Sequence, residues 1–471
     1  MRILKRCQLV LLSFVLIGGV FAAELPATVQ TALKRAAIPT AAIGVRVQDV
    51  ISGQVLLSVN AEQAFNPAST MKLVTTSAAL DLMGPTATFS TLAYTRGERK
   101  GDQLQGDLIL RGSGDPKLVV ENFWLFLRKI RAQGIRSIRG NLVLDRTAFA
   151  EVAADPSQFD GDPLKPYNAV PDALLLNFHA LAVRFAPRAD QGGVSVTLDP
   201  MLDSYPIQAP TLAAGPCPAD WRQNISPTLD GSAARFDGNY SAACGERYWQ
   251  IHPYQMSRNR YVELVFRQLW AGLGGSFEGA VIDGAVTSDA VLLTQWDSAA
   301  LPELIRDINK FSNNVMARQL FLALGNVGGS APASIATSRM AITRWLTSNG
   351  IDSTGLVLEN GSGLSRTERI SAQTLSKLLV TTFQSPVMPE FIASLPLVGY
   401  DGTMKKRLRT QGVAGRAHIK SGSLQEVRTI AGYVLAESGK RYAVVFLINH
   451  PNAARGGEAQ DALLQWIYEN N

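Results

Sequence analysis

The chain has 471 residues, 46% of them hydrophobic and 18% charged, and a formal net charge of +6. A chain of this length is expected to form about two to three domains with buried cores. Removal of an N-terminal leader carrying Arg2, Lys5 and Arg6 would lower the net charge from +6 to +3, because no acidic residue precedes Glu24. This surplus of positive charge is too small to favour a nucleic-acid-binding protein.

The N-terminal segment has the pattern of a secretory leader. Basic residues open the chain, an apolar run extends from Leu9 to Ala23, and small residues stand at Ala22 and Ala23. The run is too short to span a bilayer comfortably. We therefore predict a signal peptide over residues 1–22, a periplasmic mature protein and no stable membrane anchor.

Two cysteines, Cys217 and Cys244, remain after such a leader is removed, since Cys7 lies within it. In an oxidising compartment an even pair of thiols favours a disulfide, here one that closes a polar loop rich in Gly and Ser. A metal site is the poorer interpretation, because two thiolates without a nearby pair of histidines cannot complete a tetrahedral set of ligands. We expect no metal and no cofactor.

The predicted elements at the two ends of the chain complement each other. From the N-terminus they are a helix at 26–37, strands at 42–50 and 54–59, and a helix at 71–83 that Gly84-Pro85 stops. At the C-terminus, strands at 428–436 and 441–448 precede a terminal helix. Together the two ends would complete one antiparallel sheet flanked by helices, which makes the middle of the chain an insertion.

A candidate nucleophile lies where the N-terminal hairpin leads into the helix at 71–83. Asn66-Pro67 predicts a turn, so Ser69 stands in the first helical turn with Lys72 three residues later on the same face. Serine is a weak nucleophile at neutral pH, and an adjacent amine can serve as its base. The Ser-x-x-Lys pair alone is weak support, because a capped helix with a solvated lysine shows the same pattern.

The insertion is predicted to be rich in short strands. GDLILRGSGDPKL, a helix at 119–132 and GNLVLD follow residue 86, and a polar segment with both remaining cysteines follows from 181. We assign residues 23–85 and 287–471 to a discontinuous catalytic domain. Residues 86–180 and 253–286 are assigned to an inserted domain, and residues 181–252 to a domain nested within it.

Two further motifs suit a serine acyl-transfer site. Ser312 and Asn314 stand between predicted helices at 301–310 and 315–324, where both side chains can face a cleft. Lys420, in the segment HIKSGS on a predicted strand edge, precedes Ser421 and Gly422. A glycine there would let a ligand approach the backbone closely, and the N–H of Ser423 could then point into an oxyanion hole. The order S-x-x-K, S-x-N, K-[ST]-G is that of β-lactamases and penicillin-binding proteins.

Beyond these motifs, the chain resembles peptidase family S13, the D-Ala-D-Ala carboxypeptidase/endopeptidase family of low-molecular-mass penicillin-binding proteins of the penicillin-binding protein 4 type. The similarity covers nearly the whole mature chain. The segments that carry it are PASTMKL, GDLILRGSGDPKL, GNLVLD, KFSNNVMA, NGSGLSR, SLPLVGYDGT and IKSGSLQEV. The resemblance implies an α+β multidomain protein with a penicillin-binding/β-lactamase-like transpeptidase domain and a long inserted β-rich region of one or two subdomains.

The resemblance also implies a serine DD-peptidase that cleaves D-alanyl-D-alanine termini or D-alanyl-meso-diaminopimelate cross-links of peptidoglycan through an acyl-enzyme. Its partners would be peptidoglycan stem peptides, with β-lactam antibiotics as covalent inhibitors. The catalytic residues expected from the motifs are Ser69, Lys72, Ser312, Asn314 and Lys420. A β-lactamase and a non-catalytic penicillin-binding sensor or scaffold are the alternatives.

The expected substrate-binding residues are Ser421, Gly422, Ser423 and Asp162. The resemblance implies an acidic residue in the insertion that binds the free amine of the stem peptide's diamino acid, and in FDGD both Asp160 and Asp162 have the right chemistry. Ser421 stands where the family more often has threonine. Both hydroxyls can donate a hydrogen bond, so activity is expected to survive, while the missing methyl group bears on rotamer preference and β-lactam affinity.

Overall fold

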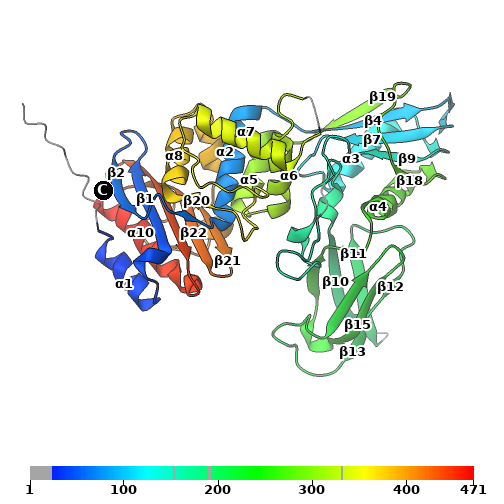
Figure 1. The fold of residues 1–471 in the computed structure, drawn as a ribbon. Coiled ribbons are helices and arrows are strands. Elements are labelled where there is room, and N and C mark those ends of the chain that lie inside the picture. Colours follow the sequence, from blue (N-terminus) through cyan, green and yellow to red (C-terminus); the bar gives the residue numbers. More distant parts are fainter. Residues whose placement is uncertain (1–23, 152–153, 189–191, 330–331) are drawn as a thin grey trace, which may run out of the picture.

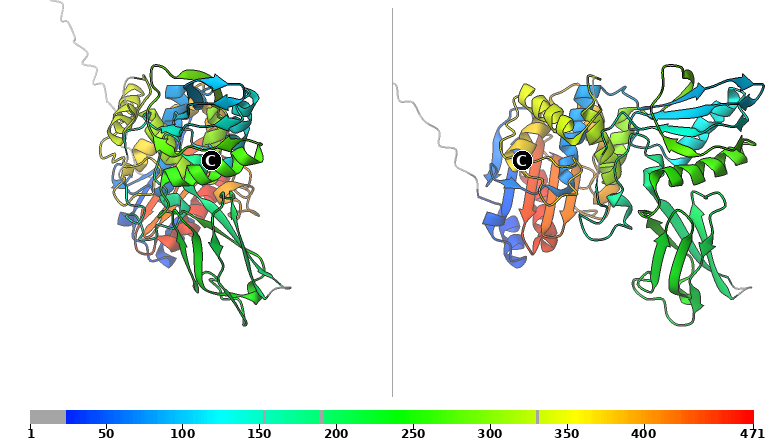
Figure 2. Two further views of the ribbon diagram at one scale, coloured as in Figure 1. Left: turned by 90° about the vertical axis from the view of Figure 1, so that its right-hand side faces the viewer. Right: turned by 45° about the vertical axis from the view of Figure 1, so that its right-hand side comes forward.

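The computed structural model describes residues 24–151, 154–188, 192–329 and 332–471. The predicted signal peptide at 1–22 lies outside these ranges. The molecule is elongated (Figures 1 and 2): a sheet lies at one end, a layer of helices follows, and the inserted region forms the other end. Among the described residues, none of the helices is both long and apolar enough to cross a membrane.

A five-stranded sheet joins the two ends of the chain, as predicted. Its strand order is β2 (Val55–Val59), β1 (Ile43–Asp49), β23 (Arg441–Asn449), β22 (Val427–Leu435) and β21 (Ala417–Leu424). Every neighbouring pair is antiparallel. The central strand β23 reads RYAVVFLIN and is almost continuously buried, which is the pattern of a strand covered on both faces.

Each face of this sheet is covered by helices. Val444, Phe446 and Ile448 pack with α1 (Ala27–Arg35) and α10 (Gly457–Asn470) in one core. The alternate residues of β23 pack in a second core with the layer of helices on the other face. That layer consists of α2 (Lys72–Met83), α5 (Leu301–Lys310), α6 (Asn314–Leu324), α7 (Ile335–Ser348), α8 (Ala372–Phe383) and α9 (Met388–Ser394).

The inserted region contains a second five-stranded sheet. Its order is β18 (Val281–Asp283), β9 (Leu142–Asp145), β7 (Asp107–Gly112), β4 (Ser90–Arg96) and β19 (Val291–Asp297). Helices α3 (Val120–Ala132) and α4 (Arg258–Gly272) share one apolar core with it. A smaller sheet consists of β17 (Ser276–Phe277), β8 (Ser137–Ile138), β6 (Gln103–Leu104) and β5 (Arg99–Lys100).

The predicted boundary at residue 287 precedes strand β19 in the chain. Strand β19 pairs antiparallel with β4, so the strand that enters the inserted region and the strand that leaves it lie side by side. The residue just before β4, Phe89, and the residue just after β19, Ser298, also exchange hydrogen bonds of 2.9 and 3.0 Å. Strand β19 is therefore part of the sheet of the inserted region.

A β-rich unit lies between Leu181 and Ile251, the range predicted for a nested domain. One sheet contains β10 (Leu181–Arg188), β11 (Gly193–Asp199) and β16 (Arg247–Ile251). A second contains β12 (Ile207–Gln208), β13 (Thr211–Ala213), β14 (Ile225–Leu229) and β15 (Ala234–Ser241). The predicted disulfide between Cys217 and Cys244 is confirmed.

The remaining elements are short. β3 (Ala64–Phe65) pairs with β20 (Ile370–Ser371). The 3-10 helices are η1 (Thr40–Ala42), η2 (Ala68–Met71), η3 (Pro166–Asn168), η4 (Leu176–His179), η5 (Ala242–Cys244), η6 (Gly402–Met404) and η7 (Ala453–Gly456).

Candidate active site

Ser69 lies in η2, the single turn that leads into α2, as the sequence predicts. Two side chains of the sheet hold this turn, and a third bond lies within it. The Oδ1 atom of Asn449 accepts a hydrogen bond of 2.7 Å from the N–H of Asn66, and the hydroxyl of Thr429 donates one of 2.7 Å to Pro67 O. Asn66 Oδ1 in turn accepts from the N–H of Ala68 at 2.9 Å. The nucleophile is thus placed by β22 and β23 as well as by its own helix.

The amine of Lys72 is fully buried and has three oxygen neighbours. Its Nζ lies 3.1 Å from Ser69 Oγ, 2.5 Å from Asn314 Oδ1 and 2.5 Å from the carbonyl oxygen of Ser362. Burial lowers the pKa of Lys72 well below its usual range, and the nearby charge of Lys420 lowers it further. These surroundings favour the neutral amine, which is the form that can accept a proton from serine.

Ser312 and Asn314 lie at the junction between α5 and α6, as predicted. Ser312 has a φ of +57°, in the left-handed region that non-glycine residues seldom adopt. The side chain of Asn313 caps α6 by accepting a hydrogen bond of 3.0 Å from the N–H of Met316. The cap fixes the start of the helix, so the residues on either side of Asn313 face Lys420 and Lys72 respectively.

Lys420 lies on β21 and is also fully buried. Its Nζ donates hydrogen bonds to Ser312 Oγ at 2.9 Å and to its neighbour's carbonyl, Ser421 O, at 2.7 Å. Burial lowers the pKa of Lys420 to about 7. The amine of Lys420 therefore changes its charge near neutral pH, within hydrogen-bonding distance of a hydroxyl.

Gly422 is the closest point of β21 to the nucleophile. A Cβ atom built there would lie 2.9 Å from Ser69 N and 2.2 Å from Thr429 Oγ1. Ser421 Oγ donates a hydrogen bond of 2.8 Å to Thr403 Oγ1 in η6, and Ser423 is exposed one residue beyond the glycine. The strand thus lies against the Ser69 turn with no side chain between them, as expected for an edge along which a ligand binds.

Hydrogen bonds in the structure therefore link Lys72 to both Ser69 and Asn314, and Lys420 to Ser312.

The two candidate acids of the insertion differ in their surroundings. Asp160 accepts hydrogen bonds from Lys165 at 2.9 Å and Tyr167 at 2.6 Å as well as from Asn168, and its side chain is 15% exposed. Against the cost of burial, these donors lower the pKa of Asp160 to about 2. Asp162 is 41% exposed.

A cavity lies between the inserted region and the catalytic domain, and most of its lining has no assigned role in the sequence analysis. Asp155, Phe159, Arg318, Glu359 and Arg366 are among the residues that line it. The guanidinium of Arg366 lies 4.9 Å from the centre of the Phe159 ring and also donates to Gln425 O in the turn after β21. The segment NGSGLSR contains Arg366, but the sequence does not show that it meets Phe159, because the two sides of the cavity are about 200 residues apart.

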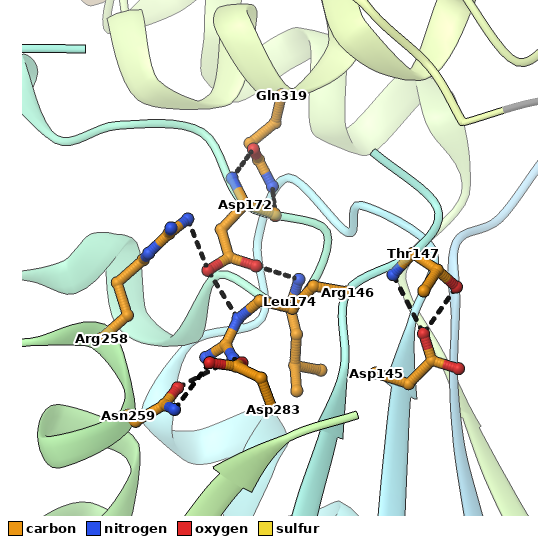
Figure 3. A network of polar contacts seen from close by, with 9 residues as sticks. All are labelled: Asp145, Arg146, Thr147, Asp172, Leu174, Arg258, Asn259, Asp283 and Gln319. Atoms are coloured by element: carbon orange, nitrogen blue, oxygen red, sulfur yellow. Dashed lines mark hydrogen bonds and ion pairs between the residues drawn. The ribbon is translucent and has the colours of Figure 1, made fainter. Parts of the chain in front are cut away.

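The inserted region is attached to both helices that flank Ser312. On α6, Gln319 donates to Asp172 O at 2.7 Å and accepts from Asp172 N at 2.9 Å (Figure 3). The buried carboxylate of Asp172 is paired in turn with Arg146 and Arg258. On α5, Asp307 forms an ion pair of 2.5 Å with Lys117.

Comparison with known proteins agrees with this geometry. Residues 25–470 match the model of Peptidase_S13, the D-Ala-D-Ala carboxypeptidase 3 (S13) family. The chain belongs to this family. It is a serine-type carboxypeptidase, and the predicted resemblance and fold class are confirmed.

Two named relatives of this S13 peptidase align over most of their length. The D-alanyl-D-alanine carboxypeptidase of Actinomadura sp. (strain R39) is 29% identical over 443 residues, which cover 90% of this chain and 80% of the relative. The D-alanyl-D-alanine carboxypeptidase DacB of Haemophilus influenzae is 26% identical over 416 residues, covering 86% and 85%.

Solved structures support the fold of the S13 peptidase. Penicillin-binding protein 4 from Haemophilus influenzae superposes with a TM-score of 0.77 over 93% of this chain and 99% of the other, at 22% identity. The same protein complexed with a β-lactam superposes with a TM-score of 0.75.

The close approach at Gly422 predicts a loss of acylation in Gly422→Ala. The new Cβ must push away Thr429 Oγ1 and the backbone of Ser69, so the rate of labelling by a fluorescent penicillin should fall by about 100-fold. Gly272→Ala is the matched control, because a Cβ there meets nothing within 4 Å. Equal labelling of both variants, with melting temperatures unchanged, would contradict the role of Gly422.

Proposed function

We propose that this S13 peptidase hydrolyses the D-alanyl-D-alanine ends of peptidoglycan stem peptides through an acyl-enzyme on Ser69. The surroundings of Lys72 carry this proposal. A neutral amine has two N–H bonds and one lone pair. Asn314 Oδ1 and Ser362 O, both 2.5 Å away, are acceptors that take the two N–H bonds. The lone pair then faces the Ser69 hydroxyl, 3.1 Å away.

Acylation follows from this arrangement. Lys72 accepts the proton of Ser69 as Oγ attacks the carbonyl carbon of the penultimate D-alanine. The tetrahedral oxyanion is stabilised by the N–H groups of Ser69 and Ser423. Ser312 passes its hydroxyl proton to the departing nitrogen of the terminal D-alanine and regains a proton from Lys420, which donates to its Oγ. Water then hydrolyses the ester, and the second product is the shortened peptide.

Substrate binding uses the same strand and helix. Lys420 and Ser421 hold the terminal carboxylate at the end of the cleft where Thr403 already positions the Ser421 hydroxyl. The side chain of Asn314 binds the substrate amide. Gly422 lets β21 pack directly against the Ser69 turn, so a peptide that lies along the strand is held next to the nucleophile.

We also propose endopeptidase action on D-alanyl-meso-diaminopimelate cross-links, covalent inhibition by β-lactams and export to the periplasm. The cavity beside Arg366 supports the first proposal, because it lies between the inserted region and the loop that carries Ser362 and is lined by acidic and basic groups. The β-lactam complex of the Haemophilus influenzae relative supports the second. The pattern of residues 1–22 supports the third.

The alternatives are separated by penicillin turnover. A peptidase consumes one equivalent of penicillin in a burst and then stalls, because its acyl-enzyme is hydrolysed slowly. A β-lactamase continues to turn penicillin over. A non-catalytic sensor or scaffold would take up penicillin without releasing D-alanine from a stem peptide.

Incubation of the purified enzyme with muropeptides is expected to release terminal D-alanine and to cleave cross-links. Mass spectrometry of the products distinguishes the two reactions. Ser69→Ala removes the nucleophile and should abolish both. The matched control is Ser77→Ala on the same helix, since the hydroxyl of Ser77 contacts Thr382 instead of the site. An unchanged rate in Ser69→Ala would refute the mechanism.

The pKa of Lys420 predicts the alkaline side of the pH profile. The lysine holds the substrate carboxylate as the ammonium, so kcat/KM should fall as the pH rises through about 7, the pKa in the free enzyme. Arginine stays protonated, so Lys420→Arg should be slower but keep its activity to about pH 9. Identical alkaline limbs in the two enzymes would show that another group titrates there.

Asp162 is our candidate for the residue that binds the free amine of the diamino acid. It is the more exposed of the two predicted acids, whereas Asp160 already accepts hydrogen bonds from three side chains. Asp162→Asn should raise KM about tenfold for stem peptides with a free amine and leave it unchanged for the N-acetylated peptides. Asp155→Asn, which alters one of the acids that line the cavity, is the comparison. The same amine-dependent rise in that variant alone would transfer the role to Asp155.

A further inference from the structure

The loop at residues 359–368 forms one wall of the Lys72 site and lies against the Ser69 turn. Besides Ser362 O, which binds Lys72, the loop offers the carbonyl of Gly361 to the hydroxyl of Thr75 at 2.6 Å. At Gly363, which has a φ of +79°, a Cβ would lie 1.8 Å from Ala68 O. The loop therefore touches both the nucleophile's turn and the helix that carries the base.

Glu368 lies inside this loop and holds its backbone. The residue has no exposed surface. One oxygen, Oε1, accepts hydrogen bonds from three consecutive N–H groups, those of Glu359 at 3.0 Å, Asn360 at 2.9 Å and Gly361 at 2.9 Å. Successive N–H groups that converge on one oxygen form a nest, which a strong acceptor stabilises in a single conformation.

A second set of hydrogen bonds, made by the side chain of Asn360, connects this part of the loop to Ser362. Asn360 Oδ1 accepts from both the N–H and the hydroxyl of Ser362, at 2.9 and 2.7 Å. The amide nitrogen of Asn360 donates to Leu364 O at 2.9 Å. The carbonyl of Ser362 is therefore fixed through two connected layers of hydrogen bonds, of which Glu368 is the innermost.

We propose that Glu368 is a positioning residue for the general base: by gathering three loop N–H groups it places the carbonyl of Ser362 against Lys72 and so directs the lysine lone pair at Ser69. This inference rests on the proposed function. If Ser362 O moves away, an N–H bond of Lys72 loses its acceptor, and the amine can rotate so that it donates to Ser69 Oγ instead of accepting its proton.

We assign the role to the reach of Glu368, although its charge also acts on Lys72 by opposing the fall in the pKa of the lysine. Its other oxygen, Oε2, is buried and has no hydrogen-bond partner among the residues that the structure describes. Burial raises the pKa of the Glu368 carboxyl, although the three backbone donors act against this rise. A neutral acceptor of the same length should therefore replace the carboxyl.

Two substitutions separate reach from charge. Glu368→Gln keeps the length and the acceptor oxygen but removes the charge, while Glu368→Asp keeps the charge and withdraws the oxygen by one methylene group. We expect Glu368→Gln to stay within about threefold of the wild-type acylation rate and Glu368→Asp to fall by about 100-fold. Both rates are measured by labelling with a fluorescent penicillin and by release of D-alanine.

Thr75→Val tests the same loop without changing Glu368. Valine has nearly the shape of threonine but cannot donate to Gly361 O, so acylation should slow by about tenfold. Asp230→Asn is the matched control, because Asp230 also accepts from loop N–H groups, those of Ser232 and Ala233, but lies in the nested β-rich unit. Its acylation rate should equal that of the wild type.

The outcomes decide the proposal. If Glu368→Gln is acylated slowly and Glu368→Asp at the wild-type rate, the charge matters and the proposal is wrong. If both variants are acylated at the wild-type rate, Glu368 has no role and the proposal is also wrong. If neither Glu368 variant folds, Thr75→Val decides, and a wild-type rate there overturns it. A wild-type enzyme that is not acylated would refute the proposed function instead.

Discussion

The buried amine of Lys72 is the constraint on which the site depends. Burying a charged ammonium costs several kcal/mol, so a buried lysine either pairs with a carboxylate or becomes neutral. Lys72 has neutral neighbours: a hydroxyl, a side-chain amide and a backbone carbonyl. These acceptors come from the Ser69 turn, from α6 and from the loop at 359–368. A displacement of any of the three would change the direction in which the amine donates.

Because the direction of the Lys72 amine depends on α6, the attachment of the insertion to this helix bears on catalysis. Asn314 stands at the start of α6, and Gln319 on the same helix binds the backbone of Asp172 through both its oxygen and its nitrogen. The neighbouring helix α5 is tied through Asp307 to Lys117. The inserted region therefore contacts both helices around Ser312, whose positive φ must be maintained by its surroundings.

Much of the catalytic domain could be predicted from local patterns. The apolar run of β23, the stop at Gly84-Pro85 and the spacing of Ser69 and Lys72 are short-range signals, and the structure bears them out. The chain between residues 325 and 400 yielded no predicted element. In α8 the reason is composition: its threonines and Val380 have weak helix propensity, and burial against the sheet determines the helix.

Other parts of the site have no signal in a single sequence. The acceptor at Ser362 is a backbone carbonyl, which every residue has. Glu368 differs from the other glutamates only in its three N–H partners, which the structure shows and the sequence does not. The contact between the Asn314 oxygen and Lys72 also has no signal in the sequence, because the two residues are far apart in the chain. The pairing of β19 with β4 has no local signal either, because it joins segments about 200 residues apart.

The serine at position 421 shows how a neighbour can replace a missing methyl group. The γ-methyl of threonine restricts rotation about χ1, whereas a serine hydroxyl turns more freely. Here Ser421 Oγ donates to Thr403 Oγ1 at 2.8 Å, and Thr403 lies in η6. Asp401 directly precedes η6 and forms an ion pair of 2.6 Å with Lys310. Lys310 is the last residue of α5, next to the Ser312 junction, so this pair anchors η6. The hydroxyl at the carboxylate end of the cleft is thus oriented by a hydrogen bond instead of by sterics. A bound carboxylate must compete with Thr403 for that hydroxyl.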